Sequence, residues 1–168
     1  MVLMNTPLPE NLASVLVVQY NAERYNSACY ASLASAFEEV NWNGFAKFMY
    51  KSSFEEMEHA KRVFDYLAER QALIEVGVVE RPPAFNGEDV LGNFRAALAL
   101  EVVNTAKFNA LARLALDMND FLTFTELGWF LDEQTKSEAE LVQIISDLEH
   151  AEDCKAAILA IDRELGAK

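Results

Sequence analysis

The stretch SSFEEMEHAKRVFDYL, residues 52–67, decides the fold class because its apolar residues recur every three or four positions. That spacing predicts a helix that buries one face against other helices. Two positions on the same face hold Glu56 and His59, which are costly to bury without a partner. The stretch therefore predicts a helical bundle and, inside it, a polar centre.

The length and the turn-forming residues favour a bundle of long helices. The chain has 168 residues, and we assign residues 1–168 to one domain. Six glycines and four prolines are few for this length, which argues against a barrel or a sandwich. Helices are expected at about residues 10–40, 45–72, 88–116, 120–148 and 152–166. The predicted fold is all-α, an antiparallel four-helix bundle with a long crossover between the second and third helices and a short fifth helix.

The charge and the hydropathy limit the possible partners. A net charge of −13 makes nucleic acids and anionic membranes poor partners, because both need Lys or Arg to neutralise phosphates. Cations are better candidates, although acids that only keep the surface soluble would give the same total. No apolar run approaches the roughly 18 residues of a membrane span, and the first residues lack a secretory pattern. The two cysteines, Cys29 and Cys154, form no paired motif. We expect a cytoplasmic protein.

Each of the first three helices carries a carboxylate in the middle of an otherwise apolar stripe. These residues are Glu23, Glu56 and Glu101, and His59 stands one turn from Glu56. A buried carboxylate costs several kcal/mol unless it is paired or bound to a metal, and these stripes hold no Lys or Arg. Glu residues combined with Glu-x-x-His form the ligand set of di-iron and di-manganese bundles. Such ligands suit iron or manganese, with zinc able to compete. A proton relay or a misread helix face would be the alternatives.

The fourth helix departs from that ligand set. A symmetric site would repeat Glu-x-x-His, but this helix has no histidine before its last turn. Its predicted buried stripe, which includes Gln134, consists of Phe124, Leu127, Leu131, Gln134, Glu138, Leu141, Ile145 and Leu148. Ser137 can also face inward. A second metal would therefore have fewer charged ligands and bind more weakly.

Four motifs in chain order resemble those of the ferritin family, in its non-haem branch. They are YNAERYNSACY (20–30), EEMEHAKRVFDYL (55–67), ALEVVN (99–104) and DEQTKSEAEL (132–141). The resemblance extends over nearly the whole chain. It implies iron as the metal, with Glu23, Glu56 and His59 holding the first ion and Glu56 bridging to a second ion that Glu101 also holds.

The resemblance also assigns roles to residues beside these ligands. Gln134 is expected near the second iron, and Tyr30 corresponds to a tyrosine that donates an electron or holds the ligands in place. Glu133 and Glu55 remain from a third iron site of bacterial ferritins. In that third site Lys136 replaces another acid and Ser137 stands where many relatives have glutamate, so its function is in doubt.

The implied activity is ferroxidase, with O₂ or peroxide as the oxidant and ferric mineral stored in a homo-oligomeric shell of twenty-four subunits. Asp120 and Glu126 could line a channel of such a shell or be plain surface charges. Haem is not expected, although Met57 stands close to where bacterioferritins carry a haem-ligating methionine. A haem-containing bacterioferritin, a shell subunit with impaired iron oxidation, and an oxygenase that oxidises an organic substrate remain alternatives.

Overall fold

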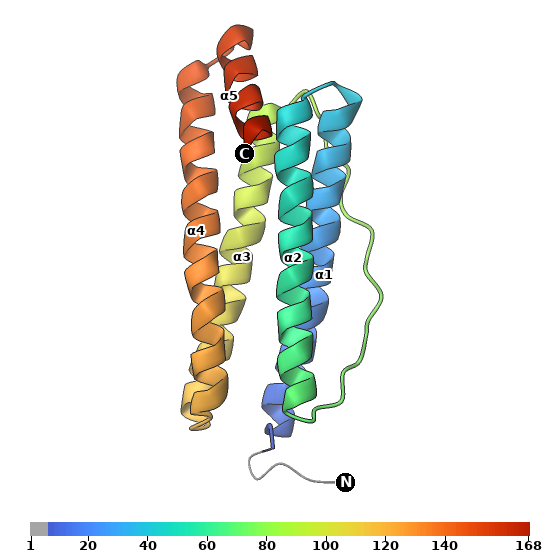
Figure 1. The fold of residues 1–168 in the computed structure, drawn as a ribbon, viewed down its shortest axis with the longest axis vertical. Coiled ribbons are helices and arrows are strands. Elements are labelled where there is room, and N and C mark those ends of the chain that lie inside the picture. Colours follow the sequence, from blue (N-terminus) through green and yellow to red (C-terminus); the bar gives the residue numbers. More distant parts are fainter. Residues whose placement is uncertain (1–6) are drawn as a thin grey trace.

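The computed structural model describes residues 7–168 and contains five helices in that range. Residues 1–6, on which the expectation about a secretory pattern partly rests, lie outside it. The helices are α1 (Glu10–Glu39), α2 (Asn43–Glu69), α3 (Val90–Asp117), α4 (Phe121–Ala151) and α5 (Lys155–Ala167). The first four form a bundle and α5 lies at one end of it (Figure 1). The prediction of an all-α bundle with a short fifth helix is confirmed. None of the described helices combines the length and the apolar composition that crossing a membrane requires.

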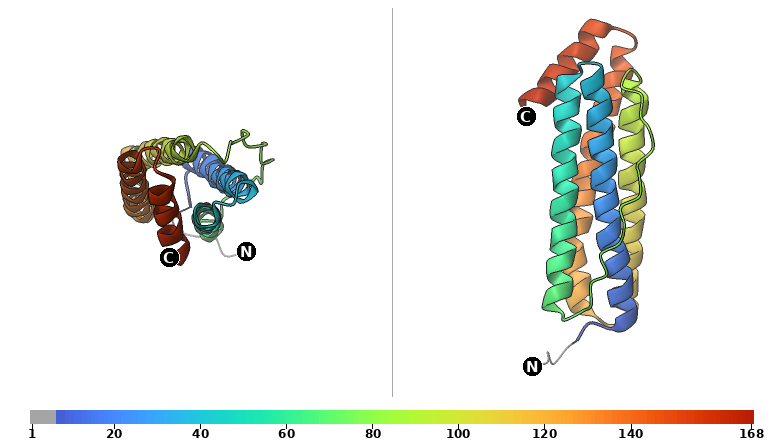
Figure 2. Two further views of the ribbon diagram at one scale, coloured as in Figure 1. Left: turned by 90° about the horizontal axis from the view of Figure 1, so that it is seen from above. Right: turned by 90° about the vertical axis from the view of Figure 1, so that its right-hand side faces the viewer.

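The connections divide the bundle into two hairpins. Helix α1 packs mainly on α2, and α3 packs mainly on α4. The segment between α2 and α3 runs the whole length of the bundle along α1, so α2 and α3 point in the same direction (Figures 1 and 2). Asn21 on α1 fixes this crossover, because its side chain donates to the Glu75 carbonyl at 3.0 Å and accepts from the Gly77 N–H at 2.8 Å.

Three helices end in the same way, without glycine. Asn41, Gln71 and Asn119 follow α1, α2 and α3 with positive φ. In each turn the N–H of the next residue bonds to the carbonyl oxygen five residues back, at 2.9–3.0 Å, which satisfies a carbonyl of the last helical turn. This left-handed turn ends α2 at Glu69 rather than at Ala72, where the sequence pattern placed it.

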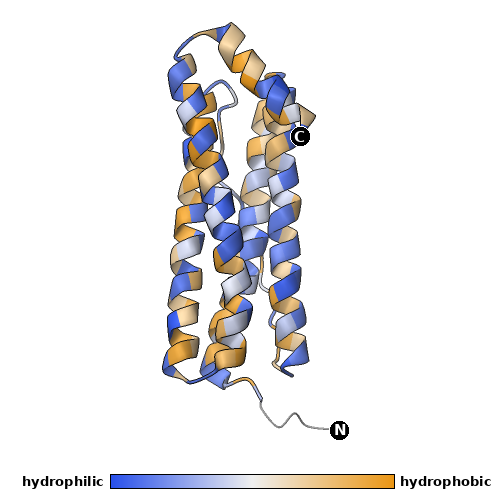
Figure 3. Cartoon of the chain, turned by 60° about the vertical axis from the view of Figure 1, so that its left-hand side comes forward, coloured by the Kyte–Doolittle hydropathy of each residue, from blue (hydrophilic) through white to orange (hydrophobic). Residues whose placement is uncertain are grey.

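The apolar core consists of two clusters, and buried polar residues lie between them. Hydrophobic and hydrophilic residues alternate along each helix, as expected for helices that bury one face (Figure 3). The cluster near α5 contains Phe37, Phe45, Phe94 and Leu148, and the other contains Leu12, Leu67, Phe108 and Leu127. One expected core residue is wrong: Phe124 is 40% exposed, and Phe130 is buried in the second cluster. The helical rotation of α4 at this end therefore differs from the predicted stripe.

Helix α5 is fixed to the beginning of α2 by a close backbone approach. A Cβ atom on Gly44 would lie only 1.6 Å from the carbonyl oxygen of Asp162, so this position requires glycine. The buried carboxylate of Asp162 accepts the N–H of Phe45 at 2.8 Å. It thereby satisfies an N–H in the first turn of α2, as a side-chain cap from α2 itself would do.

A buried ion pair closes the opposite end of the bundle. Arg70 Nη2 lies 2.8 Å from Asp120 Oδ2, and Nη1 lies 3.2 Å from Oδ1. Asp120 Oδ1 also accepts the N–H of Thr123 at 3.0 Å, which caps α4. The Arg70 guanidinium lowers the pKa of Asp120. Within the described chain Asp120 is thus engaged with Arg70, and Glu126 is engaged with Arg62 at 2.5 Å.

Candidate metal centre

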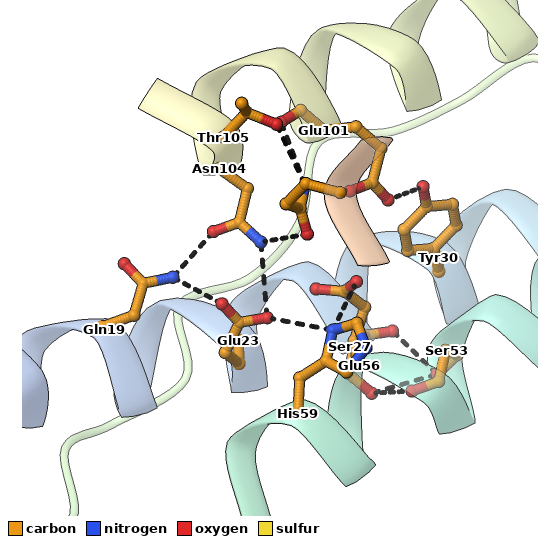
Figure 4. Close-up of polar contacts among 11 residues, drawn as sticks. Gln19, Glu23, Ser27, Tyr30, Ser53, Glu56, His59, Glu101, Asn104 and Thr105 are labelled. Carbon is orange, nitrogen blue, oxygen red and sulfur yellow. Dashed lines mark hydrogen bonds and ion pairs between the residues drawn. The ribbon is translucent and has the colours of Figure 1, made fainter. Parts of the chain in front are cut away.

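Three of the predicted ligands meet in the middle of the bundle. Glu23 from α1 and Glu56 and His59 from α2 each offer a ligand atom within 4.8 Å of the other two. All three are buried, with exposed fractions of 0%, 3% and 6%. His59 Nδ1 lies 3.8 Å from Glu23 Oε2 and 3.5 Å from Glu56 Oε1 (Figure 4). The helical spacing of three residues brings Glu56 and His59 to one point, as the sequence predicted.

Two atoms of this group lack a hydrogen-bond partner in the described part of the chain. They are Glu56 Oε2 and His59 Nδ1, both fully shielded from solvent. Leaving a buried polar atom unsatisfied costs about 1–3 kcal/mol, and more for a charged group. A carboxylate oxygen and an imidazole nitrogen are also donors that divalent iron, manganese and zinc accept. The donor set therefore fits a metal ion.

Glu101 of α3 stands on the other side of the centre. It accepts the phenolic O–H of the buried Tyr30, and its Oε2 accepts the amide N–H of Gln134 at 2.8 Å. The same Gln134 nitrogen also donates to the Glu101 backbone carbonyl at 3.2 Å. Burial, followed by the nearby carboxylates, raises the pKa of Tyr30 well above its usual value, so the neutral phenol is the donor.

A cavity of about 260 Å³ joins these residues to the other predicted acids. Its walls include Glu56, His59, Glu101 and Tyr30, and also Glu55 and Glu133. The last two are partly exposed, and Glu133 is 2.6 Å from the ammonium of Lys136. The structure thus brings both remaining acids of the expected third site to the cavity. Both already have a cationic partner within the chain, because Glu55 Oε1 lies 3.8 Å from the ammonium of Lys51.

The electrostatics of the centre show an excess of negative charge. Burial raises the pKa of Glu56 well above its usual value and also raises the pKa of Glu101, because a carboxylate loses its hydration there. Burial opposes a charged imidazole, but the carboxylates of Glu23 and Glu56 outweigh this effect and raise the pKa of His59 to about 10. Without a metal, His59 therefore carries a proton at neutral pH.

Aromatic side chains hold His59 from the side of α4. The Trp129 ring meets the imidazole edge to face, with the ring centres 5.5 Å apart. The guanidinium of Arg62 lies 4.1 Å from the centre of the Trp129 ring and pairs with Glu126. Trp129 therefore packs against the centre.

Two buried amides at the centre were missed from the sequence. Gln19 is 2% exposed and Asn104 is 0% exposed. Gln19 Nε2 donates to Glu23 Oε1 and to Asn104 Oδ1, and Asn104 Nδ2 lies 3.4 Å from Glu23 Oε2 (Figure 4). A signal was available, since Gln19 precedes Glu23 by four residues and Asn104 follows Glu101 by three, both spacings of one helix face.

A four-helix bundle with this crossover and this carboxylate–histidine centre defines the class of ferritin-like carboxylate proteins. Comparison of the sequence with protein families agrees, because residues 14–151 match the ferritin family, described as a ferritin-like domain. The chain belongs to the ferritin family.

Individual relatives are similar along almost the whole chain. Bacterial non-heme ferritin of Staphylococcus aureus (strain USA300) is 30% identical over 161 residues, with 96% of each chain covered. The Staphylococcus epidermidis protein of the same name is 30% identical over 162 residues, again with 96% of each covered. Among solved structures, an open pore ferritin of Archaeoglobus fulgidus has a TM-score of 0.93 and 32% identity, covering 96% of this chain and 99% of the archaeal one.

Proposed function

We propose that this protein is an iron store with ferroxidase activity, which oxidises Fe(II) to Fe(III) at a di-iron site inside each subunit. The observation that carries the proposal is the pair of buried atoms without hydrogen bonds, Glu56 Oε2 and His59 Nδ1. They belong to a group in which Glu23, Glu56 and His59 offer ligand atoms within 4.8 Å of one another. Membership of the ferritin family supports it.

The side chains take distinct roles in the proposed reaction. Glu23, Glu56 and His59 bind the first Fe(II), and Glu56 also bridges to a second Fe(II) held by Glu101. Two Fe(II) ions supply one electron each, and together with two protons these reduce O₂ to H₂O₂; alternatively, they reduce H₂O₂ to two molecules of water. Tyr30 and Gln134 hold Glu101 through hydrogen bonds.

The proposal extends to the assembly and to the fate of the product. Glu55 and Glu133 lie along the same cavity and would receive iron that leaves the centre, with Lys136 limiting how much they bind. Ferric mineral would be stored in a cytoplasmic homo-oligomeric shell of twenty-four subunits, without haem and without nucleic-acid or membrane partners. The similarity to the open pore ferritin of Archaeoglobus fulgidus supports a shell.

Stopped-flow absorbance during addition of Fe(II) to the aerobic metal-free protein tests the activity. We expect a fast phase whose amplitude saturates near two Fe(II) per chain. Saturation near one would mean that Gln134 does not complete the second position. No fast phase would contradict the proposal and favour a shell subunit that depends on other chains for oxidation.

Substitutions of the proposed ligands test whether the fast phase arises at the metal centre. Glu56→Ala and His59→Ala should each slow it at least tenfold, since metal ligands are removed, while the oligomer still forms on gel filtration. His150→Ala is the matched control, because it removes the other histidine of the chain, which is exposed on α4. Equal rates in all three variants would contradict the assignment of the site.

A further inference from the structure

A chain of side-chain amides crosses the bundle behind the metal centre and connects its two halves. It begins at Glu23 on α1, passes through Gln19 to Asn104 on α3 at 2.7 Å, and continues to Gln134 on α4 at 3.4 Å. It ends where Gln134 donates to Glu101 at 2.8 Å. The three amide side chains are at most 2% exposed, so solvent does not compete for these bonds.

The chemistry of the two ends fixes the direction of every amide. An ionised carboxylate only accepts hydrogen bonds, so Gln19 must turn its NH₂ group toward Glu23. The other hydrogen of that group goes to Asn104 Oδ1, which leaves the Asn104 NH₂ group to face Glu23 Oε2 and Gln134 Oε1.

At the other end of the chain the same logic applies to Gln134. Its oxygen accepts from Asn104, so its NH₂ group faces Glu101 and Thr105. Thr105 in turn donates its hydroxyl hydrogen to Glu138 and is left as an acceptor for Gln134. Each donor in the chain therefore has an acceptor, and reversing one amide would place two donors or two acceptors face to face.

We propose that Gln19 and Asn104 are positioning residues of the metal centre: they hold the Glu23 carboxylate toward His59 and keep the Gln134 amide turned so that it donates to Glu101. This inference rests on the proposed function, because it concerns how the same centre binds metal. It assigns Gln134 a hydrogen-bonding role toward Glu101, with its amide oxygen directed at Asn104.

Partners that orient metal ligands affect affinity strongly, and their loss commonly reduces metal affinity by about 10–100-fold. Asn104→Leu removes the central link at nearly constant volume, and Gln19→Met removes the link to Glu23. Each variant should weaken the binding step that involves Glu23 by about tenfold or more. The double variant should lose about as much as the more affected single variant, since both substitutions interrupt one network.

The test is an anaerobic titration with Co(II), followed by calorimetry and by the visible absorption of the bound ion. Asn93→Leu is the matched control, because Asn93 is also a buried asparagine on α3 but bonds to the Asn86 carbonyl, away from the centre. Thermal melting of each variant measures its stability separately. If Asn104→Leu does not fold, the Co(II) affinity of Gln19→Met tests the same hydrogen bond between Gln19 and Asn104.

The outcomes separate the two proposals. Failure of the unmodified protein to bind Co(II) would overturn the proposed metal centre itself. Normal binding by the unmodified protein with unchanged Co(II) affinity and spectrum in Gln19→Met and Asn104→Leu would overturn only the positioning role. Equal weakening in the Asn93→Leu control, or losses that multiply in the double variant, would also overturn it.

Discussion

Two groups of charged side chains lie inside the bundle, and they are built differently. At one end Arg70 and Asp120 form a two-point ion pair in which cation and anion balance, although Arg70 Nε has no partner in the described chain. In the middle, the carboxylates of Glu23, Glu56 and Glu101 face a single histidine. Even a protonated His59 cannot neutralise three carboxylates. The ion pair stabilises one end of the bundle, whereas the central carboxylates lack a compensating positive charge in the absence of a bound cation.

The largest effect on the free energy of unfolding is expected at the Arg70–Asp120 ion pair. Arg70→Met leaves the Asp120 carboxylate buried without its partner, and breaking a buried pair in this way costs about 3–5 kcal/mol. The loss would appear as a lower denaturant midpoint at the same protein concentration, with Co(II) binding unchanged. Arg95→Met is the control: its ion pair with Glu149 is more than half exposed on both sides, so at most about 1 kcal/mol should be lost. Similar losses of stability in Arg70→Met and Arg95→Met would contradict the view that the Arg70–Asp120 pair stabilises the end of the bundle.

A smaller effect on the free energy of unfolding, of opposite sign, is expected at the carboxylate–histidine centre. Glu56→Leu removes a buried carboxylate whose Oε2 has no hydrogen-bond partner in the described chain and which lies near the carboxylates of Glu23 and Glu101. An unsatisfied buried polar atom costs about 1–3 kcal/mol, and its removal relieves that cost. The metal-free variant should therefore denature at the same or a higher denaturant concentration than the unmodified protein while it loses Co(II) binding. A clear destabilisation would indicate that Glu56 is satisfied without a metal. Glu55→Leu, at a half-exposed position, serves as the control.

The two groups should also respond to pH in opposite directions. The pKa of His59 is raised to about 10 in the folded protein, so its stabilisation is complete below its usual value of 6.5 and is lost as the pH rises to about 10. One proton contributes at most about 1.4 kcal/mol per pH unit. The lowered pKa of Asp120 gives stability above its usual value of 3.8 that is lost as the pH falls below it. Melting curves of the metal-free protein between pH 6.5 and 10 should show the decline, and His59→Leu should flatten it.

The sequence predicted the burial of the central carboxylates because each one interrupts an apolar stripe. Glu23, Glu56 and Glu101 were visible as costly residues at positions that the helical period buries. Arg70 occupies the next position of the α2 stripe after Tyr66 and is buried, so the expectation that the stripes hold no Lys or Arg is wrong at this position. The closed ion pair was therefore not anticipated, and Asp120 was left between a channel residue and a surface charge.

The amides were harder to predict because neutral polar side chains are common on both faces of a helix. Gln19 and Asn104 become conspicuous only when the packing of α1, α3 and α4 shows them to be buried and connected. Phe124 shows the complementary error. A period of three or four positions allows two neighbouring faces, and only contacts across the bundle decide that Phe130 is the buried one.

The division of the bundle into two hairpins has a consequence for the order in which the centre is made. Glu23, Glu56 and His59 all belong to the hairpin of α1 and α2, whereas Glu101 and Gln134 belong to the hairpin of α3 and α4. Contacts within each hairpin are close in sequence and form quickly, but docking of the hairpins must close the long crossover. During synthesis the first hairpin is made before α3. The first metal position is therefore encoded in the part of the chain that is made first, and the second position is completed when the hairpins dock.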